Sequence, residues 1–446
     1  MIRVRQRAGG ATPAVVARRW LDRIGERRWA VSALVVSATT VTAGVAVLVC
    51  TMWPVDLEVY RFGAQALAQG HNVYGTLPPT RSGMLLPFIY PPFAAVTFLA
   101  LTAPPVQVAS VLMLGISLAA LGTTVYVVIR PHATRRTAVL AAVSLGAVAL
   151  AFEPVRQTLW FGQVNLVLMA LVVLDCLGPK TRLPRGVLLG LAAAVKITPA
   201  GFLLFFLLKR DFRAAGTAVA TFAVAGLAGF AAAPRASVDY WFGGGLTGAS
   251  GMSGSIFATN QTIQGAVHRF GLPATSALVL IALVTLAALL CAVVAIRRAD
   301  PPMAFLLNAA VVLVCSPISW SHHWVWIVPA VILLGARATS RRAVAGLLAV
   351  AVVFVVAPHS LMPSQDFREL SWRPIEHLLG NSYLVLALGF LGWQFVALTA
   401  GRRTRRGSRG QSAGTSASTR SASRAASTGA RVTQSAPPAP GDCAAE

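Results

Sequence analysis

Two acidic residues directly after the first long apolar run are the clearest candidates for proton-transfer chemistry. Asp56 lies close enough to that run for partial desolvation to raise the pKa of its carboxyl group. Such a carboxylate can act as a general base, although the same position also suits an interfacial acid paired with Arg61. Glu58 lies two residues further on, so a helix would point the two carboxylates in different directions rather than pairing them.

A pair of adjacent histidines, His322 and His323, stands in the most polar and aromatic break between apolar runs, at residues 316–326. Adjacent histidines at a membrane face can bind phosphate, share a proton or ligate a metal ion. Metal ligation is the weakest of these interpretations, because no HxH or HxxxH spacing and no carboxylate occurs in the segment. The alternative is an aromatic belt at the membrane surface that contains two histidines by chance.

Lys196 is an ionisable residue inside an apolar run, where a charge is costly and usually has a partner. A lipid-linked phosphate would supply that partner. The alternative is a lysine that extends its ammonium group to a nearby interface. Pro199 interrupts the same run and argues against a smooth continuous helix there.

Two short segments combine side-chain amides with aromatic or glycine neighbours. Amides suit sugar hydroxyls, because each amide can both donate and accept a hydrogen bond. They equally suit helix capping and hydrogen bonds between helices. The residues concerned are Gln163 and Asn165 in the first segment, and Asn260 and Gln261 in the second.

The elements that position these residues are expected to be membrane helices. Hydrophobic residues make up 56% of the 446 residues and charged residues only 12%, which is too little charge to cover a soluble globule of this size. Several apolar runs, including residues 30–52, 106–129 and 274–296, approach or exceed the roughly 20 residues that cross a bilayer. The composition therefore predicts an all-α polytopic membrane protein.

The net charge of +24 is explained by membrane topology, without any need for nucleic acid. Eight arginines lie before residue 29, eight more follow residue 401, and others stand in short connectors. Clusters of this kind are typical of cytoplasmic segments. We therefore expect a basic cytoplasmic N-terminus at residues 1–29, a membrane domain at 30–400, and a disordered cytoplasmic tail rich in Ser and Arg at 401–446.

Following the charged connectors from an inner N-terminus predicts about ten full crossings and two partial or re-entrant segments. The partial segments are residues 91–101, flanked by prolines, and residues 186–208. The second is expected to be a half-depth hairpin with Lys196 at its tip, because basic residues of the same side flank both of its ends. The full crossings are predicted at residues 30–52, 106–129, 137–152, 164–177, 214–233, 274–296, 303–317, 324–336, 343–357 and 381–399.

This topology places the candidate chemistry on the outer face of the plasma membrane. Seven of the 14 acidic residues, Asp56 and Glu58 among them, and six of the seven histidines fall on that side. No P-loop, Rossmann glycine motif, HExxH or GxSxG occurs, and no cytosolic catalytic domain is evident. An enzyme of this kind must take its substrates from the lipid phase or the outer compartment.

Six short motifs follow one another along the chain. They are VDLEVY at 55–60, FIYPPF at 88–93, GQVN at 162–165, KITP at 196–199, NQ at 260–261 and SPISWSHHW at 316–324. In this order and spacing they together resemble one family, the actinobacterial polyprenyl-phosphate-mannose-dependent α-1,2-mannosyltransferases of the GT-C superfamily, the PimE-like group. The resemblance spans roughly residues 50 to 330 and leaves the tail outside.

The resemblance implies a GT-C fold and an inverting transfer of mannose from polyprenyl-phosphate mannose to a phosphatidylinositol mannoside. Asp56 stands at the position of the family's essential aspartate and would accept the proton of the acceptor 2-hydroxyl. Lys196, His322 or His323, and Arg269 would offset the phosphate charge, so neither a metal ion nor another cofactor is expected. The residues expected to bind the sugar or acceptor, or to shape the lipid entrance, are Glu58, Tyr90, Gln163, Asn165, Asn260 and Gln261.

Alternatives remain at this point. His323 could be the base, with Asp56 orienting it, because a sequence gives no distance between them. The acceptor could instead be lipomannan or lipoarabinomannan, receiving single α-1,2-mannose branches. A transporter of a lipid-linked saccharide would also need half-helices and a buried lysine, and it predicts inverted repeats that are not evident. In a structural membrane protein, Asp56 and the histidines would be replaceable.

Overall fold

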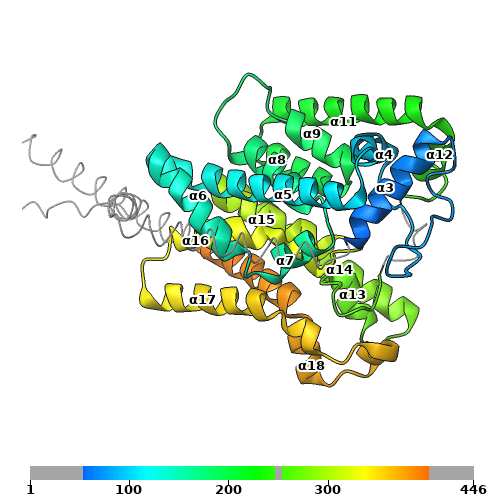
Figure 1. The fold of residues 1–446 in the computed structure, drawn as a ribbon. Helices are drawn as coiled ribbons and strands as arrows, with labels where there is room; N and C mark the ends of the chain where they lie inside the picture. Colours follow the sequence, from blue (N-terminus) through cyan, green and yellow to red (C-terminus); the bar gives the residue numbers. More distant parts are fainter. Residues whose placement is uncertain (1–53, 247–253, 401–446) are drawn as a thin grey trace, which may run out of the picture. The chain divides into compact units, whose positions relative to one another are not determined.

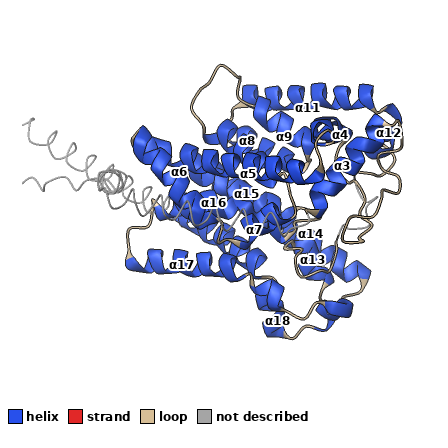
Figure 2. Cartoon of the chain, in the orientation of Figure 1, coloured by secondary structure: helices blue, strands red, loops and turns tan. Residues whose placement is uncertain are grey.

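The computed structural model describes residues 54–246 and 254–400. The predicted first crossing, the basic N-terminus and the Ser/Arg-rich tail lie outside these residues. The described part is helical, and Figure 2 shows helices joined by loops. Within it, the sole extended pairing is one antiparallel bridge between Asn260 and Trp320. The prediction of an all-α protein is confirmed.

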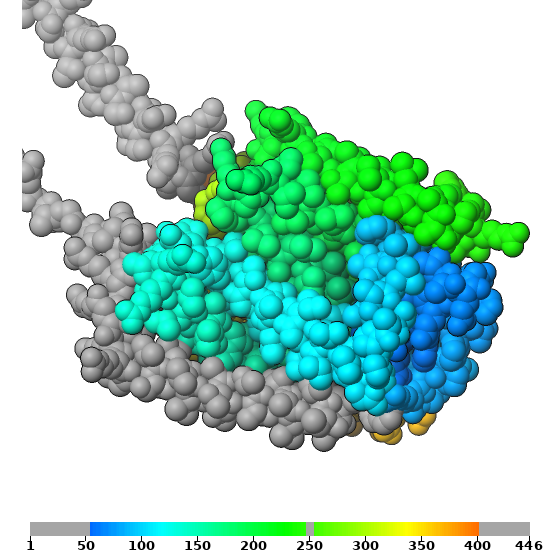
Figure 3. All heavy atoms as spheres, turned by 45° about the horizontal axis from the view of Figure 1, so that its top comes forward, coloured from blue at the N-terminus to red at the C-terminus, as the bar shows by residue number. Residues whose placement is uncertain are grey.

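Helix α3 (Val55–Ala68) begins the described chain and packs against the short helix α4 (Pro92–Phe98). The rings of Tyr60 and Phe98 stack with their centroids 4.3 Å apart. Helix α12 (Pro234–Trp241) lies at the same end of the molecule, where Tyr74 stacks on Tyr240 at 5.5 Å. Figures 1 and 3 show this neighbourhood, in which the blue start of the chain lies beside the green segment around α11 and α12.

Four helices in the described part are long and apolar enough to cross a membrane. They are α5 (Val106–Ile129), α11 (Phe212–Ala232), α14 (Ala274–Arg298) and the helix Ser382–Ala400. A fifth span exists if α6 (Arg135–Ala149) and α7 (Glu153–Trp160) count as one, although they meet at a bend of 84°. Pro154 explains the bend, because proline removes a helical hydrogen bond and clashes with the preceding turn.

Shorter apolar helices occupy the positions of the other predicted crossings. They are α8 (Asn165–Leu177), α15 (Pro301–Cys315), η4 (Ser321–Trp326) continuing into α16 (Ile327–Gly335), and α17 (Arg341–Val356). Short or irregular elements make up the rest. They are η1 (Leu99–Leu101), η2 (Arg130–His132), α13 (Ile263–His268), η5 (Pro358–Leu361), η6 (Gln365–Ser371) and α18 (Pro374–Gly380).

The segment at residues 186–208 turns back on itself at Lys196. Helix α9 (Val187–Val195) ends there, and η3 (Thr198–Phe202) and α10 (Leu203–Leu208) follow. Gly186 abuts the first turns of α11, since a Cβ at Gly186 would come within 2.1 Å of the Ala214 carbonyl oxygen. α10 ends just before α11 begins, so both ends of the segment lie near the start of α11. Lys196 therefore lies at the tip of a helical hairpin.

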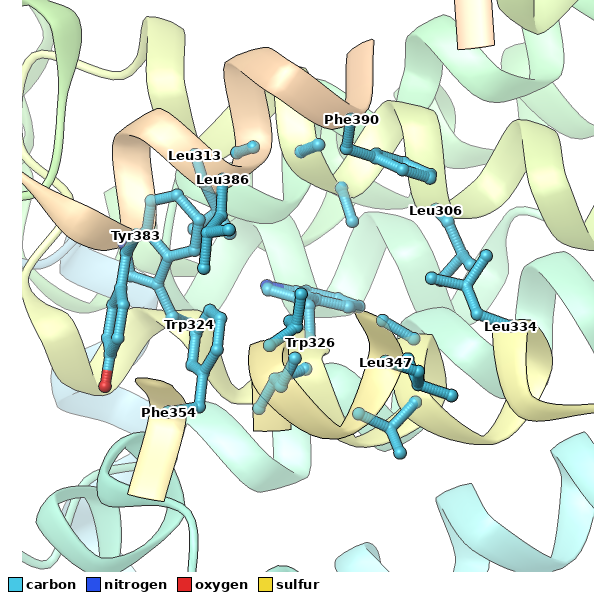
Figure 4. Close-up of a pocket in the computed structure, with 17 residues that line it drawn as sticks. Leu306, Leu313, Trp324, Trp326, Leu334, Leu347, Phe354, Tyr383, Leu386 and Phe390 are labelled. Atoms are coloured by element: carbon cyan, nitrogen blue, oxygen red, sulfur yellow. The ribbon is translucent and has the colours of Figure 1, made fainter. Parts of the chain in front are cut away.

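An apolar cavity of about 140 Å³ lies between α15, α16, α17 and the helix Ser382–Ala400 (Figure 4). Its walls are leucine, valine, alanine and aromatic side chains, among them Trp324, Trp326 and Phe354. The hydroxyl of Tyr383, which also lines it, donates to Glu153 Oε2 at 2.9 Å. This cavity contains no group suited to catalysis.

Candidate active site

A cavity of about 240 Å³ brings together six of the residues that the sequence nominated. Its walls come from the first turn of α3, residues 86–91, the Gln163 turn, the tip of the Lys196 hairpin and residues 316–323. These segments are widely separated in the sequence. The six residues are Asp56, Tyr90, Gln163, Lys196, His322 and His323.

Asp56 lies in the first turn of α3, outside the candidate membrane spans. The amides of Asp56 and Leu57 donate to the Phe161 carbonyl oxygen at 3.1 and 3.2 Å, which fixes the start of the helix. Burial raises the pKa of the Asp56 carboxyl to about 6, against the opposing effects of a hydrogen bond from Gln163 and the charge of Lys196. A carboxylate with this pKa is ionised at neutral pH and basic enough to accept a proton.

Gln163 is oriented by Tyr60, which the sequence analysis did not nominate. The Tyr60 hydroxyl donates to Gln163 Oε1 at 2.7 Å, so the amide nitrogen of Gln163 is the atom free to donate to Asp56. Tyr60 is fully buried and its hydroxyl also lies 3.3 Å from that of Tyr90. Tyr60 follows Asp56 by four residues and so shares its helix face, which is the signal that could have identified it.

Gly162 holds the turn before Gln163 against the start of α3. Its φ is +66°, a conformation that glycine adopts readily. A Cβ at this position would come within 2.8 Å of Leu57 Cβ and 2.9 Å of Pro54 Cβ. The GQVN motif therefore contains a glycine because the turn packs directly on the helix that carries Asp56.

Lys196 has two neutral hydrogen-bond partners at the hairpin tip. Its Nζ lies 3.0 Å from Asn165 Oδ1 and 3.0 Å from His323 Nε2, and it stands 5.6 Å above the ring centre of Tyr90. Among the residues that the structure describes, no carboxylate forms an ion pair with it. The ammonium charge thus faces the cavity with room for an anionic partner.

The hydrogen bond to Lys196 sets the tautomer of His323. A charged ammonium can only donate, so His323 Nε2 must accept and the ring proton is on Nδ1. His323 Nδ1 and His322 Nε2 are both buried without a protein partner in the described part of the chain. In this state Nε2 already accepts from Lys196 and Nδ1 carries a proton, so neither ring nitrogen is free to accept another, which disfavours His323 as the base.

The histidine segment is held by α7 and α8. Thr158 Oγ1 and Asn165 Nδ2 both donate to the His322 carbonyl oxygen at 3.0 Å. Ser321 Oγ donates to Glu153 Oε1 at 2.7 Å. Asn165, nominated for sugar binding, therefore supports both His322 and Lys196 and does not line the 240 Å³ cavity.

Glu58 and Arg269 lie outside the cavity as well. Glu58 is buried, accepts from the Arg81 amide at 2.9 Å and pairs with the Arg81 Nε at 3.4 Å. The Arg269 guanidinium donates to three backbone carbonyls at 2.9 to 3.1 Å and to Asn381 Oδ1. These protein acceptors surround the guanidinium of Arg269, so the structure does not bring it to the residues that face the cavity.

Asn260 and Gln261 also make protein contacts in place of cavity contacts. Asn260 Oδ1 accepts from the Ser319 amide at 3.1 Å, and its Nδ2 donates to the Ser255 carbonyl at 2.9 Å. Gln261 Nε2 donates to the carbonyls of Ala258 and Gly380 at 2.7 and 2.6 Å. Both amides fasten loops together. Tyr240 and Trp320 line the cavity, although the sequence analysis nominated neither.

A helical membrane-type fold with one carboxylate, one lysine and two histidines facing a single cavity defines a class of membrane enzyme that can act on an anionic substrate. The chain belongs to glycosyltransferase family 87, whose model matches residues 88–317. That segment contains Tyr90, Gln163 and Lys196, while Asp56 precedes it and the histidine pair follows it. Family membership makes this protein a glycosyltransferase and disfavours the transporter interpretation.

Similar proteins are known from mycobacteria. A polyprenol-phosphate-mannose-dependent α-(1-2)-phosphatidylinositol mannoside mannosyltransferase of Mycolicibacterium smegmatis is 35% identical, over 85% of this chain and 91% of that protein. A protein of the same name from Mycobacterium tuberculosis is 37% identical, over 78% and 86%. A phosphatidylinositol pentamannoside mannosyltransferase of M. tuberculosis is 33% identical, over 76% and 80%. No solved structure matches the chain.

Proposed function

We propose that this protein is an inverting α-1,2-mannosyltransferase that moves mannose from polyprenyl-phosphate mannose to a phosphatidylinositol mannoside. We further propose that the cavity opens on the outer face of the plasma membrane and that both termini are cytoplasmic, as the positions of the basic connectors predict. The observation that carries the proposal is the convergence of Asp56, Lys196 and His323 on one cavity. The relatives' names supply the sugar, the linkage and the acceptor class.

In the proposed reaction, Asp56 accepts the proton of the acceptor 2-hydroxyl while that oxygen attacks the anomeric carbon of mannose. The new carbon–oxygen bond forms on one face as the bond to the donor phosphate breaks on the other. Polyprenyl phosphate leaves with the bonding electrons, and a single displacement of this kind inverts the β-linked donor to an α-linked product. Gln163 keeps the ionised carboxylate oriented through its amide N–H.

The leaving phosphate gains negative charge as its bond to mannose breaks. Lys196 supplies a positive charge that no carboxylate of the described residues neutralises in an ion pair, and His323 Nε2 holds its ammonium group in place. The ammonium group is in position before the reaction, so it stabilises the developing charge without reorganisation. A phosphate monoester is a fair leaving group, and we propose that these side chains replace a metal ion.

The direct test is transfer by the purified full-length protein in detergent. Incubation with radiolabelled polyprenyl-phosphate mannose and phosphatidylinositol mannosides of defined mannose number is expected to give an α-1,2-linked product, identified by linkage analysis. Lipomannan is the competing acceptor in the same assay. Preferred transfer to lipomannan would replace the proposed acceptor, and no transfer to any acceptor would overturn the proposal.

Activity is expected to rise with pH through the pKa of Asp56. Because burial raises that pKa to about 6, the carboxyl group is mostly protonated below pH 6 and cannot accept a proton. We predict that kcat/KM falls about tenfold per pH unit below this point and levels off as the pH approaches 7. The test is to measure kcat/KM for the donor at each pH with the acceptor at saturation. Values independent of pH between 5 and 7 would contradict the base assignment.

A further inference from the structure

A second polar cavity lies far from the candidate active site. It has a volume of about 450 Å³ and receives the C-terminal residues of α8 and the first residues of α15. α8 begins at Asn165, beside Lys196, and α15 ends at Cys315, just before Ser316 of the active-site wall. These helices of 13 and 15 residues are about 20 Å long at 1.5 Å per residue, so the two cavities lie at their opposite ends.

The walls of this cavity combine an apolar surface with cationic groups. The apolar part includes Val128, Phe205 and Phe206, which come from α5 and α10. Arg185 and Lys209 contribute cations and His132 an imidazole. A volume of this size is typical of ligand sites, and the mixture of side chains suits a molecule with one anionic and one apolar part.

Neither basic side chain is neutralised by a carboxylate ion pair in the described part of the chain. Arg185 donates to the Cys176 carbonyl at 3.0 Å and is otherwise exposed. Lys209 Nζ donates to the carbonyls of Ile296 and Ala299, at 3.3 and 2.6 Å. Their positive charges therefore remain available to an anion.

Three aspartates lie nearby: Asp300 forms an ion pair with Arg337, and the other two are engaged in capping helices. Asp211, which lines the cavity, accepts from the Ala214 amide at 3.1 Å at the start of α11. Asp175 accepts from the amides of Gly186 and Leu189, each at 2.8 Å, at the start of α9. The surrounding connectors add further cations, namely Arg130, Arg135, Arg136, Lys180, Arg182, Arg210, Arg213, Arg297 and Arg298. The charge at this end is strongly positive.

We propose that this cavity binds the phosphate headgroup of an anionic glycerophospholipid. Arg185, Lys209 and His132 receive the phosphate, and the valine and phenylalanine walls receive the first part of an acyl chain. Basic pockets between membrane helices bind anionic lipid headgroups in this way, with roughly 1 kcal/mol for each basic residue near the surface. The topology predicted from the charges places the site in the cytoplasmic leaflet, on the side opposite to catalysis.

The test uses the purified full-length protein in detergent, with dioleoylphosphatidylglycerol and dioleoylphosphatidylcholine as probes. Native mass spectrometry is expected to show preferential retention of phosphatidylglycerol, and that lipid is expected to raise the thermal unfolding midpoint more than phosphatidylcholine does. Arg185→Gln is expected to weaken phosphatidylglycerol binding about fivefold, which corresponds to about 1 kcal/mol. The matched control is Arg182→Gln, because Arg182 is exposed on the same connector but does not line the cavity.

Each other outcome counts against the site. Equal retention of the two lipids would show that the lipid charge plays no role. If Arg182→Gln weakens phosphatidylglycerol binding as much as Arg185→Gln does, the attraction is a diffuse one to the basic surface. Displacement of the lipid by excess inorganic phosphate indicates a site for free anions. The thermal unfolding midpoint of Arg185→Gln without added lipid shows whether this variant is folded. If Arg185→Gln does not fold, His132→Gln provides the same comparison and is expected to show weaker phosphatidylglycerol binding.

Discussion

Replacing Asp56 with asparagine is expected to lower kcat by about 10²- to 10⁴-fold, the usual contribution of a general base. Asparagine keeps the size of the side chain and can still contact Gln163, but it cannot accept the acceptor proton. The measurement is the initial rate of mannose transfer at saturating donor and acceptor. Turnover near that of the wild type would contradict the assignment of Asp56 and return attention to His323.

The same substitution is expected to stabilise the fold. A carboxyl group whose pKa rises on folding binds its proton more tightly in the folded state, so ionisation costs stability above pH 6 and nothing well below pH 4. For a rise from 3.8 to about 6, this cost is about 3 kcal/mol at neutral pH, and asparagine avoids it. The thermal unfolding midpoint of Asp56→Asn is expected to exceed that of the wild type at pH 7.5, and this difference is expected to shrink toward pH 4. Such a result, together with the loss of activity, would exclude misfolding as the cause of that loss.

Glu58→Gln is the matched control, since it is the same chemical change two residues along the same helix. Glu58 is buried against Arg81 and does not line the cavity, so its amide variant is expected to keep kcat within a few-fold of the wild type. A loss as large as that of Asp56→Asn would mean that any change to α3 abolishes transfer, and the general-base argument would fail.

Replacing Lys196 with methionine is expected to lower kcat by about 10²- to 10³-fold, the range measured when one group that stabilises a developing charge is removed. Methionine retains the length of the side chain and suits an apolar surrounding, but it provides neither charge nor donor. The negative charge on the phosphate increases as its bond to mannose breaks. The effect on kcat is therefore expected to exceed the effect on the KM for the donor.

Two further variants test whether the charge at Lys196 is responsible. Lys196→Arg keeps the charge in a different shape and is expected to recover part of the rate. Lys180→Met, in an exposed connector, is the control and is expected to be near normal. A fall in donor affinity alone, with kcat unchanged in Lys196→Met, would show that Lys196 binds the donor without assisting departure of the phosphate.

The sequence predicted the helices well where charge or proline interrupts an apolar run. The run at 106–129 became α5 with the same limits, because Pro105 precedes it and Arg130 follows it. The hairpin at Lys196 was predicted because basic residues flank both of its ends. The number of crossings was less predictable, since α8 and α15 are shorter than a bilayer needs and apolarity alone does not distinguish a tilted span from a buried helix.

The candidate site was predictable where an ionisable group stood in apolar surroundings, as Asp56 and Lys196 do. Such groups are expensive to bury, so their presence indicates a function. The positions of Asn260, Gln261 and Arg269 outside the cavity were not predictable, because amide and guanidinium groups bind backbone carbonyls as well as they bind sugars or phosphate. Only the three-dimensional packing decides between these partners. Tyr60 was missed because its role is to orient another side chain.

The opposite charges of Lys196 and Asp56 have a consequence for inhibitor chemistry. Lys196, held by His323 Nε2, presents only donors at one part of the cavity, and Asp56 presents an ionised acceptor at another. The complementary small molecule carries a dianionic group at one end and a neutral hydroxyl or ammonium at the other. A compound with its anionic group toward Asp56 meets repulsion instead, so the polarity of the cavity dictates the direction in which such a molecule can bind.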